Sequence, residues 1–334
     1  MRKQILALTS IILLLPASVL SDKRGSLPRS EKKQAVKIPT TLWHQPNDIG
    51  TLNLFYGPEG RAGQPRGPFR FVEEDRDGGS PKFVVKDGRG VRWKVKLGKE
   101  AKPETAATRL LSAVGYYADA TYYLPQLRVV GLPKLSRGQN YVSANGIVHG
   151  ARLERIEKGI KKIDDWSWFD NPFVGTKEFN GLRVMMALMN SWDLKKSNNA
   201  IYNLRGREQR YAVKDLGATF GKTGGDGSRS KGDLEDYLES EFIDEITATS
   251  VNLVLRSRPP ILYAVAVPYY IKRTRMEKVA DDIPRAHARW IGQWLARLSD
   301  KQIRDAFLGA GYEAQEANAY AGKVRERIRR LNSL

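Results

Sequence analysis

The chain has 334 residues, of which 41% are hydrophobic and 28% charged, so it can bury the core of one two-lobed domain or two small domains. It contains no cysteine, which excludes disulfides, zinc–thiolate sites and a cysteine nucleophile. The formal net charge of +19 leaves nucleic acid, anionic lipid and phosphorylated ligands open as partners. The Lys and Arg residues are scattered along the chain, which also fits an ordinary solvated surface.

Residues 1–21 have the three-part pattern of a secretory signal. Arg2 and Lys3 precede an apolar run, and Val19 and Ser21 fit the −3 and −1 positions of a cleavage site. The run is shorter than the roughly 20 apolar residues of a membrane span, although an uncleaved anchor is the alternative to a cleaved signal. We therefore expect an extracytoplasmic protein, periplasmic or secreted. Residues 22–66 are rich in Lys, Arg, Pro and Gly and predict a linker or a loosely packed extension.

Residues 67–157 predict a small β-rich lobe with one helix. Alternating apolar and polar residues indicate strands, and the Asp87-Gly88 turn predicts a hairpin. Pro103 at the first turn and Glu104 near the positive helix end begin the predicted helix. The predicted strands cover 69–75, 82–87, 91–98, 124–132 and 151–159, and the predicted helix covers 102–118.

Residues 158–334 predict a larger, mainly helical lobe. A strongly apolar helix over 176–192 is expected at its centre, followed by two short strands at 200–204 and 210–217. After residue 233 the pattern indicates several helices, which end with 298–312 and 316–331. The fold class predicted is α+β with two unequal lobes.

Polar residues follow the central helix and the second short strand. Asp193-Leu-Lys-Lys-Ser-Asn198 lies before the first strand, and Lys214-Asp215-Leu-Gly217 ends the second. Phosphoryl transfer needs metal ions held by oxygen ligands, a cation on the phosphates and a carboxylate that orients the acceptor. Because Mg²⁺ prefers carboxylate and amide oxygens and keeps several waters, one Asp and one Asn are sufficient protein ligands.

These motifs resemble the protein-kinase-like superfamily over roughly residues 69–330. The stretch DLKKSN is similar to its catalytic loop, and VKDLG is similar to its Asp-Phe-Gly motif with Leu216 in place of Phe. The stretch RWKVKLG resembles the strand that carries the phosphate-binding lysine. The stretch PETAATRLLSAVGY looks like the equivalent helix of the HipA-like and phosphoinositide-kinase-like branches. Together with the signal, the resemblance implies an exported bacterial-type member with a bilobal kinase-like fold.

The resemblance also implies a role for each matching residue. Asp193 would be the catalytic base or the group that orients the acceptor, and Lys195 would contact the γ-phosphate. Asn198 and Asp215 would bind Mg²⁺, whereas Lys96, with Glu104 as its partner, would hold the α- and β-phosphates of ATP. The residues expected to cover the phosphates are Gly78, Gly79 and Ser80.

Several alternatives stay open at these positions. Asn199 could replace Asn198 as a ligand, Lys94 or Lys82 could replace Lys96, and Glu104 could simply favour its helix N-terminus. Trp192 stands where typical protein kinases carry Arg, which argues against control by a phosphorylated activation loop. The glycine-rich stretch 220–236 is predicted to be a mobile segment equivalent to the activation segment rather than a nucleotide P-loop.

The sequence therefore predicts an ATP- and Mg²⁺-dependent phosphotransferase that acts on the hydroxyl of an unknown protein, lipid or small molecule. A non-catalytic nucleotide-binding pseudokinase is the main alternative because ATP is scarce outside the cytoplasm, and nucleotidyl transfer is a weaker one. No specific nucleic-acid partner is expected, since no recognised motif supports one. The basic charge could bring the protein into contact with a membrane surface.

Overall fold

The computed structural model describes residues 38–222, 230–255 and 275–334, and the predicted signal segment lies outside them. This part of the chain mixes α-helices with β-sheets, as the sequence predicts. None of its helices has the length and apolar character needed to cross a membrane.

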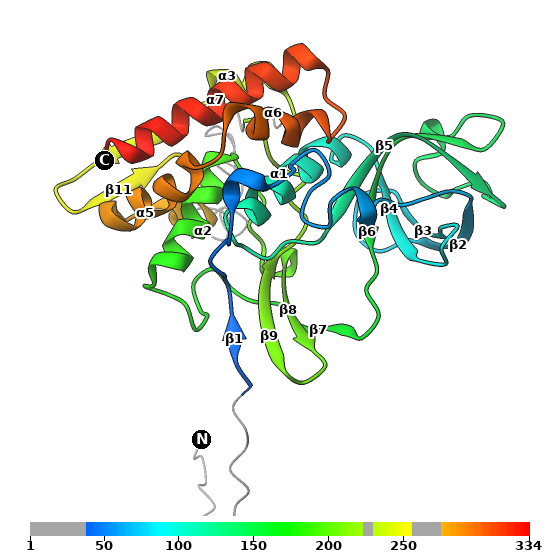
Figure 1. Cartoon of the computed structure of the whole chain (residues 1–334), viewed down its shortest axis with the longest axis horizontal. Helices are drawn as coiled ribbons and strands as arrows, with labels where there is room; N and C mark the ends of the chain where they lie inside the picture. The colour runs from blue at the N-terminus through cyan, green and yellow to red at the C-terminus, as the bar shows by residue number, and fades with distance from the viewer. Residues whose placement is uncertain (1–37, 223–229, 256–274) are drawn as a thin grey trace, which may run out of the picture. The chain divides into compact units, whose positions relative to one another are not determined.

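Five strands form a closed barrel in the first half of the described chain (Figure 1). Alternation sends Phe83, Val85, Trp93 and Val95 into the barrel core, where each is fully buried. The opposite face of the same strands carries charged side chains. The barrel strands, in the order in which they pair, are β2 (Phe69–Asp75), β3 (Lys82–Lys86), β4 (Arg92–Leu97), β6 (Ile147–Arg155) and β5 (Thr121–Val130).

Helix α1 (Ala101–Ala113) follows β4 after a short turn. Its residues Ala106, Leu110 and Leu111 are fully buried in the main hydrophobic core. Glu104 lies in the first turn of the same helix, where its carboxylate favours the positive helix end. The helix therefore brings an acidic side chain against the charged outer face of the barrel.

Helix α2 (Lys177–Leu188) is the central helix of the second half, and the side chain of Thr176 caps it by accepting a hydrogen bond from the Phe179 amide. Two antiparallel strands follow it in the chain, β8 (Asn199–Leu204) and β9 (Glu208–Val213), with Asn199 opposite Val213. Strands β1 (Thr40–Thr41) and β7 (Ile160–Asp164) complete a sheet in the order β1-β9-β8-β7.

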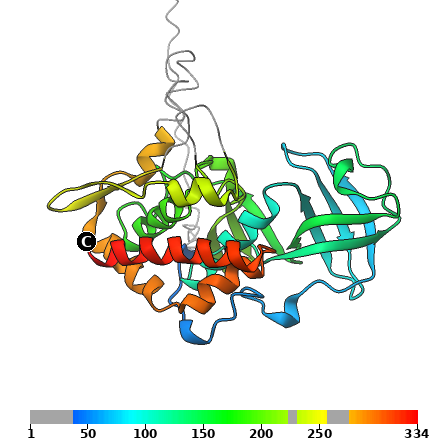
Figure 2. The ribbon, with the colours of Figure 1, turned by 90° about the horizontal axis from the view of Figure 1, so that it is seen from above.

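Helices of the C-terminal part pack on one another, and one of them packs on α2 and another on α1 (Figures 1 and 2). They are α3 (Leu234–Glu239), α5 (Arg285–Ala296), α6 (Asp300–Leu308) and α7 (Ala314–Asn332). Short 3-10 turns are η1 (Ile49–Thr51), η2 (Arg61–Gly63), η3 (Gln139–Tyr141), η4 (Lys196–Asn198) and η6 (Lys278–Ala280).

Two expectations about the elements need correction. The region after 233 also contains a three-stranded sheet, in which Val251 and Leu253 are buried by alternation. Its strands are β10 (Ile243–Ile246), β11 (Ser250–Leu253) and β12 (Ile283–Pro284). The expected loose extension is packed where the structure describes it, because Leu42 and Ile49 are buried and the Gln302 side chain donates to the Ile49 carbonyl at 2.7 Å.

Candidate active site

Lys96 lies at the centre of a cluster of carboxylates. Its strand β4 directs it away from the barrel core, yet α1 and the turn at Asp215 cover it, so its side chain is only 5% exposed. Its Nζ atom lies 2.5 Å from Glu100 Oε2, 3.0 Å from Glu104 Oε2 and 2.6 Å from Asp215 Oδ1. Burial opposes the charge of Lys96, but the carboxylates outweigh burial and raise the pKa of its ammonium group.

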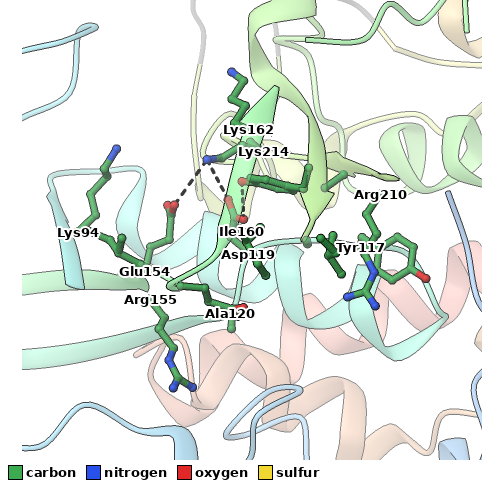
Figure 3. A pocket seen from close by; sticks show the side chains of 16 residues that line it. Lys94, Tyr117, Asp119, Ala120, Glu154, Arg155, Ile160, Lys162, Arg210 and Lys214 are labelled. Carbon is green, nitrogen blue, oxygen red and sulfur yellow. Dashed lines mark hydrogen bonds and ion pairs between the residues drawn. The ribbon is translucent and has the colours of Figure 1, made fainter. Parts of the chain in front are cut away.

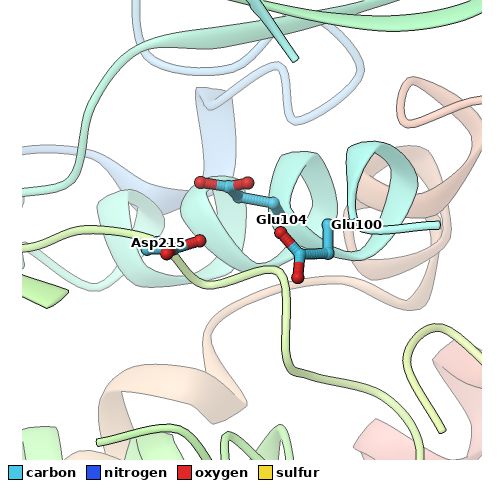
Figure 4. A group of neighbouring side chains, drawn as sticks. All are labelled: Glu100, Glu104 and Asp215. Carbon is cyan, nitrogen blue, oxygen red and sulfur yellow. The ribbon is translucent and has the colours of Figure 1, made fainter. Parts of the chain in front are cut away.

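The three carboxylates of this cluster lie in different environments (Figure 4). Burial raises the pKa of Glu104, an effect that Arg152 and Lys96 offset only in part. Burial also opposes ionisation of Glu100, but Lys96 and Lys231 lower its pKa to about 2. The side chain of Asp215 is 50% exposed, and its backbone φ of 47° lies in the left-handed region that non-glycine residues rarely adopt. Strain of this kind is frequent at functional sites.

The same carboxylates are a candidate divalent-cation site. Oxygen atoms of Glu100, Glu104 and Asp215 lie within 4.8 Å of one another. Hard oxygen donors suit Mg²⁺ or Mn²⁺. The Lys96 ammonium stands among them, so a cation at their centre requires this ammonium to move. Asp215 is the most exposed of the three and is the member best placed to hold a cation at the edge of the cluster.

Buried ion pairs continue from Glu104 along the outer face of the barrel. Arg152 lies 3.2 Å from Glu104 and 3.0 Å from Glu154. The Lys214 Nζ atom then joins Glu154, at 3.6 Å, to Asp119, at 3.3 Å. Negative and positive side chains alternate along this network from Asp215 to Asp119. The network therefore holds Glu104, a partner of Lys96, in place. Nothing in the local sequence around Arg152, Glu154 or Asp119 predicts it, because the partners come from distant strands and loops.

A recess of about 360 Å³ opens beside Glu154, Lys214 and Asp119 of this network. Figure 3 shows Lys214 reaching Glu154 and Asp119 inside it. Tyr202 donates to Asp119 at 2.9 Å from one wall. Lys94, two residues before Lys96 on the same strand face, and Lys214, next to Asp215, both line the recess, which therefore adjoins the carboxylate cluster. Other lining residues are Tyr117, Ala118, Ala120, Arg155, Ile156, Glu157, Ile160, Lys162, Leu204, Arg210 and Ala212.

The loop between α2 and β8 holds Asp193. The Asn198 side-chain amide donates to the Asp193 carbonyl at 2.7 Å and to its carboxylate at 3.3 Å, and Lys195 Nζ donates to that carboxylate at 2.8 Å. Because the nitrogen of Asn198 is used in this way, its oxygen is the atom that can bind a cation. The Lys214 amide donates to the Asn198 carbonyl at 2.8 Å, which brings this loop next to Asp215. The alternative ligand Asn199 is buried and donates to the Trp166 carbonyl at 2.9 Å.

A fully buried arginine of α7 supports the start of this loop. Arg327 donates to the Leu188 carbonyl at 2.9 Å and to Asn190 Oδ1 at 3.0 Å, so it satisfies acceptors where α2 ends. It also donates to Ser240 Oγ at 2.7 Å. The chain that leads from α2 to Asp193 is therefore tied to the C-terminal helix. No sequence pattern indicates this role, since Arg327 lies among other basic residues.

The predicted phosphate-covering loop connects β2 and β3. Gly78 has a φ of 64° and Gly79 has no neighbour that an added Cβ would meet within 4 Å. Ser80 Oγ donates to Glu100 Oε2 at 2.9 Å, which ties this loop to the start of α1. The alternative lysines Lys82 and Lys94 both pair with Asp75, at 3.7 and 3.2 Å. Of the three candidate lysines, Lys96 is the one that lies among the acidic residues of the cluster.

The predicted activation-like segment partly lies outside the described residues, which lack 223–229. Its flanks are joined, because the Ser230 amide donates to the Lys222 carbonyl at 3.1 Å. Lys231 pairs with Glu100 and lies 5.4 Å from the centre of the Trp192 ring. A Cβ atom on Gly217 would lie 2.6 Å from the Glu100 Cβ, so glycine is required for this close approach.

No protein-family model and no curated protein sequence matches the chain. Among solved structures, the chain is similar to the proinflammatory kinase CtkA of Helicobacter pylori, with 10% identity, a TM-score of 0.42, and coverage of 79% of this chain and 96% of that one. The Golgi casein kinase is similar at 12% identity and a TM-score of 0.37, over 85% of this chain and 76% of that one. A second structure of that kinase, with Mn and ADP bound, has a TM-score of 0.36 at 12% identity over 85% and 75% of the two chains.

Proposed function

We propose that the chain is a kinase-like phosphotransferase that transfers the terminal phosphoryl group of ATP to a hydroxyl acceptor. One observation carries the proposal: Lys96 of the barrel contacts Glu104 of α1 and Asp215 at the end of the β8–β9 hairpin, at 3.0 and 2.6 Å. Two neighbouring elements, β4 and α1, and a turn more than 100 residues further along the chain thus place a cation and two carboxylates together. Phosphoryl transfer uses such a set for positioning and charge stabilisation.

The recess beside the cluster is the proposed site for the nucleoside end of the substrate. Its volume of about 360 Å³ and its mixture of apolar and polar lining suit a nucleobase. The phosphates would then extend past Lys94 toward Lys96, beneath the loop that contains Gly78, Gly79 and Ser80. Lys96 exchanges its contact with Asp215 for one with phosphate oxygens, which releases the Asp215 carboxylate.

Asp215 and the Asn198 oxygen are the proposed protein ligands of Mg²⁺. Two observations support these ligands for Mg²⁺. The carboxylate of Asp215 is half-exposed, and the hydrogen bond from the Lys214 amide to the Asn198 carbonyl brings Asn198 next to Asp215. When bound, the ion neutralises charge that develops on the phosphate oxygens. Glu100 and Glu104 keep Lys96 in place while Asp215 changes partner.

Asp193 is the proposed base for the acceptor. Its carboxylate is oriented by Asn198 and by Lys195, which lies 2.8 Å from Asp193 Oδ2. The acceptor oxygen forms a bond to the terminal phosphorus as the bond to the ADP leaving oxygen breaks, and the hydroxyl proton passes to Asp193. Lys195 also stabilises negative charge on the transferred group.

The wider setting is part of the same proposal. The barrel with α1 and the helical part act as the two lobes of a kinase-like fold, and residues 1–21 export the chain or anchor it outside the cytoplasm. The acceptor is a protein, lipid or small molecule that bears a hydroxyl group.

Incubation of the full chain with γ-labelled ATP and Mg²⁺ tests this proposal. We expect labelled acceptor, autophosphorylated chain or released phosphate from the wild type, and a loss of at least about 100-fold in D215N because a metal-binding charge is removed. The control D244N changes an exposed aspartate of β10 and should behave as the wild type. Equal turnover by wild type and D215N would contradict the proposal.

Nucleotide binding without turnover would instead assign the chain to the non-catalytic alternative. This outcome is read from the same proteins by titration with ATP and Mg²⁺. Adenylated products, identified by mass, would indicate nucleotidyl transfer at the same site.

A further inference from the structure

We propose that a recess between α6 and α7 binds a phosphate group. This recess of about 360 Å³ lies apart from the residues of the candidate active site. Helices α6 and α7 lie side by side in Figures 1 and 2. Six residues give the recess its character, namely Lys301, Arg304, Asn318, Gly322, Arg325 and Arg329.

The charge of the recess is strongly positive. Among the described residues that line it, four are Lys or Arg, whereas Asp300 alone is acidic. Asp300 accepts from Arg325 at 2.5 Å, and Lys301 pairs with Asp305 at 2.5 Å. These two cations are therefore neutralised within the protein.

The other two cations lack such compensation. Within the described part of the chain, the side chains of Arg304 and Arg329 have no hydrogen-bond or ion-pair partner, and Arg304 Nε is buried. The remaining acidic residues of α7 are engaged elsewhere, since Glu326 pairs with Lys323 at 3.2 Å and Glu316 accepts from the Glu313 amide at 3.0 Å. The guanidinium of Arg304 is partly buried, so its lack of a partner costs free energy that an anionic ligand would recover, whereas Arg329 is exposed to solvent.

The chemistry of the donors defines the ligand. Arginine presents a planar set of N–H donors that matches the oxygens of a phosphate, and two arginines from neighbouring helices can bind one group from two sides. The space beside Gly322 is open, because this glycine is exposed and a Cβ added to it would meet nothing within 4 Å. The recess is large enough for a pyrophosphate or for the phosphate-bearing headgroup of a lipid, and both offer the same chemistry.

Binding measurements on the full chain test this inference and separate the two sources of phosphate. Inorganic pyrophosphate is titrated by calorimetry, and vesicles of phosphatidylcholine with or without phosphatidylglycerol are used in co-sedimentation. The proteins are the wild type, the double variant R304Q/R329Q, and R289Q, which removes one positive charge from an exposed site on α5. A common melting temperature shows that all three are folded.

The inference predicts that R304Q/R329Q weakens binding by about tenfold or more, whereas R289Q leaves it within about twofold. Pyrophosphate bound at the Lys96 cluster, and vesicles bound through residues 1–21, contribute equally to all three proteins. Weaker pyrophosphate binding by R304Q/R329Q indicates a soluble phosphate ligand. Weaker binding by this variant to anionic vesicles alone indicates a lipid headgroup. Equal binding by all proteins, an equal loss in R289Q, or no binding to either probe would overturn the inference.

Discussion

Replacing Lys96 with methionine removes the ammonium group that contacts Glu100, Glu104 and Asp215 together. Its distances of 2.5 to 3.0 Å from their oxygens correspond to roughly 5–7 kcal/mol of gross attraction per contact at an effective dielectric constant of about 20. The desolvation of a side chain that is only 5% exposed opposes most of this attraction. Measured losses for removing one partner of a buried ion pair are about 3–5 kcal/mol, so we expect K96M to lose about that much stability.

The assay is unfolding by guanidinium chloride at neutral pH, first without divalent cations. K86M is the matched control because Lys86 is exposed at the end of β3, and it should change stability by less than about 0.5 kcal/mol. Adding Mn²⁺ should restore part of the stability of K96M, since the ammonium group no longer stands among three carboxylates whose oxygens lie within 4.8 Å of one another. A K96M protein as stable as K86M, with no response to Mn²⁺, would refute the reasoning.

Three further predictions concern the surroundings of the cluster. Lys96 and Lys231 lower the pKa of Glu100 from 4.5 to about 2, so its contribution of roughly 3 kcal/mol to the free energy of unfolding is complete above pH 4.5 and is lost as the pH falls toward 2. Unfolding curves of E100Q should lack this part of the pH dependence. E100Q curves with the same pH dependence as the wild type would contradict this prediction. R327M should lose about 3 kcal/mol in urea unfolding because it leaves the buried acceptors at the end of α2 unsatisfied, and a change below about 1 kcal/mol would argue against that role. G217A should slow phosphoryl transfer by about 100-fold because its Cβ would lie 2.6 Å from Glu100 and displace the turn after Asp215, whereas normal turnover would show that the approach is not required.

The barrel and the central helix could be predicted from the sequence because their signals are local. Alternation over Phe69–Asp75 and the Asp87-Gly88 turn specify strands and a hairpin, and the apolar run of α2 specifies a buried helix. The small sheet of β10, β11 and β12 was missed because its strands have only two to four residues each. Their pairing depends on long-range contacts that no short window contains.

The candidate site also contains residues that local motifs predict and residues that only long-range contacts bring together. The resemblance of DLKKSN and VKDLG to kinase motifs is the ground on which Asp193, Asn198 and Asp215 are predicted, and the structure brings Lys96 and Glu104 together as that resemblance implies. Their roles toward a nucleotide remain predictions. Glu100 was missed, although its position four residues after Lys96 was visible, because a second carboxylate on one lysine has no local signature. Arg152, Glu154 and Lys214 form their network only through the folded barrel.

The most direct test is the anomalous scattering of Mn²⁺ in a crystal of the full chain grown with a non-hydrolysable ATP analogue. The proposed function predicts a manganese peak bound by Asp215 and Asn198, with the base in the recess lined by Lys94 and Lys214 and the phosphates on Lys96. A nucleotide bound elsewhere, or a metal that does not touch Asp215, would contradict it.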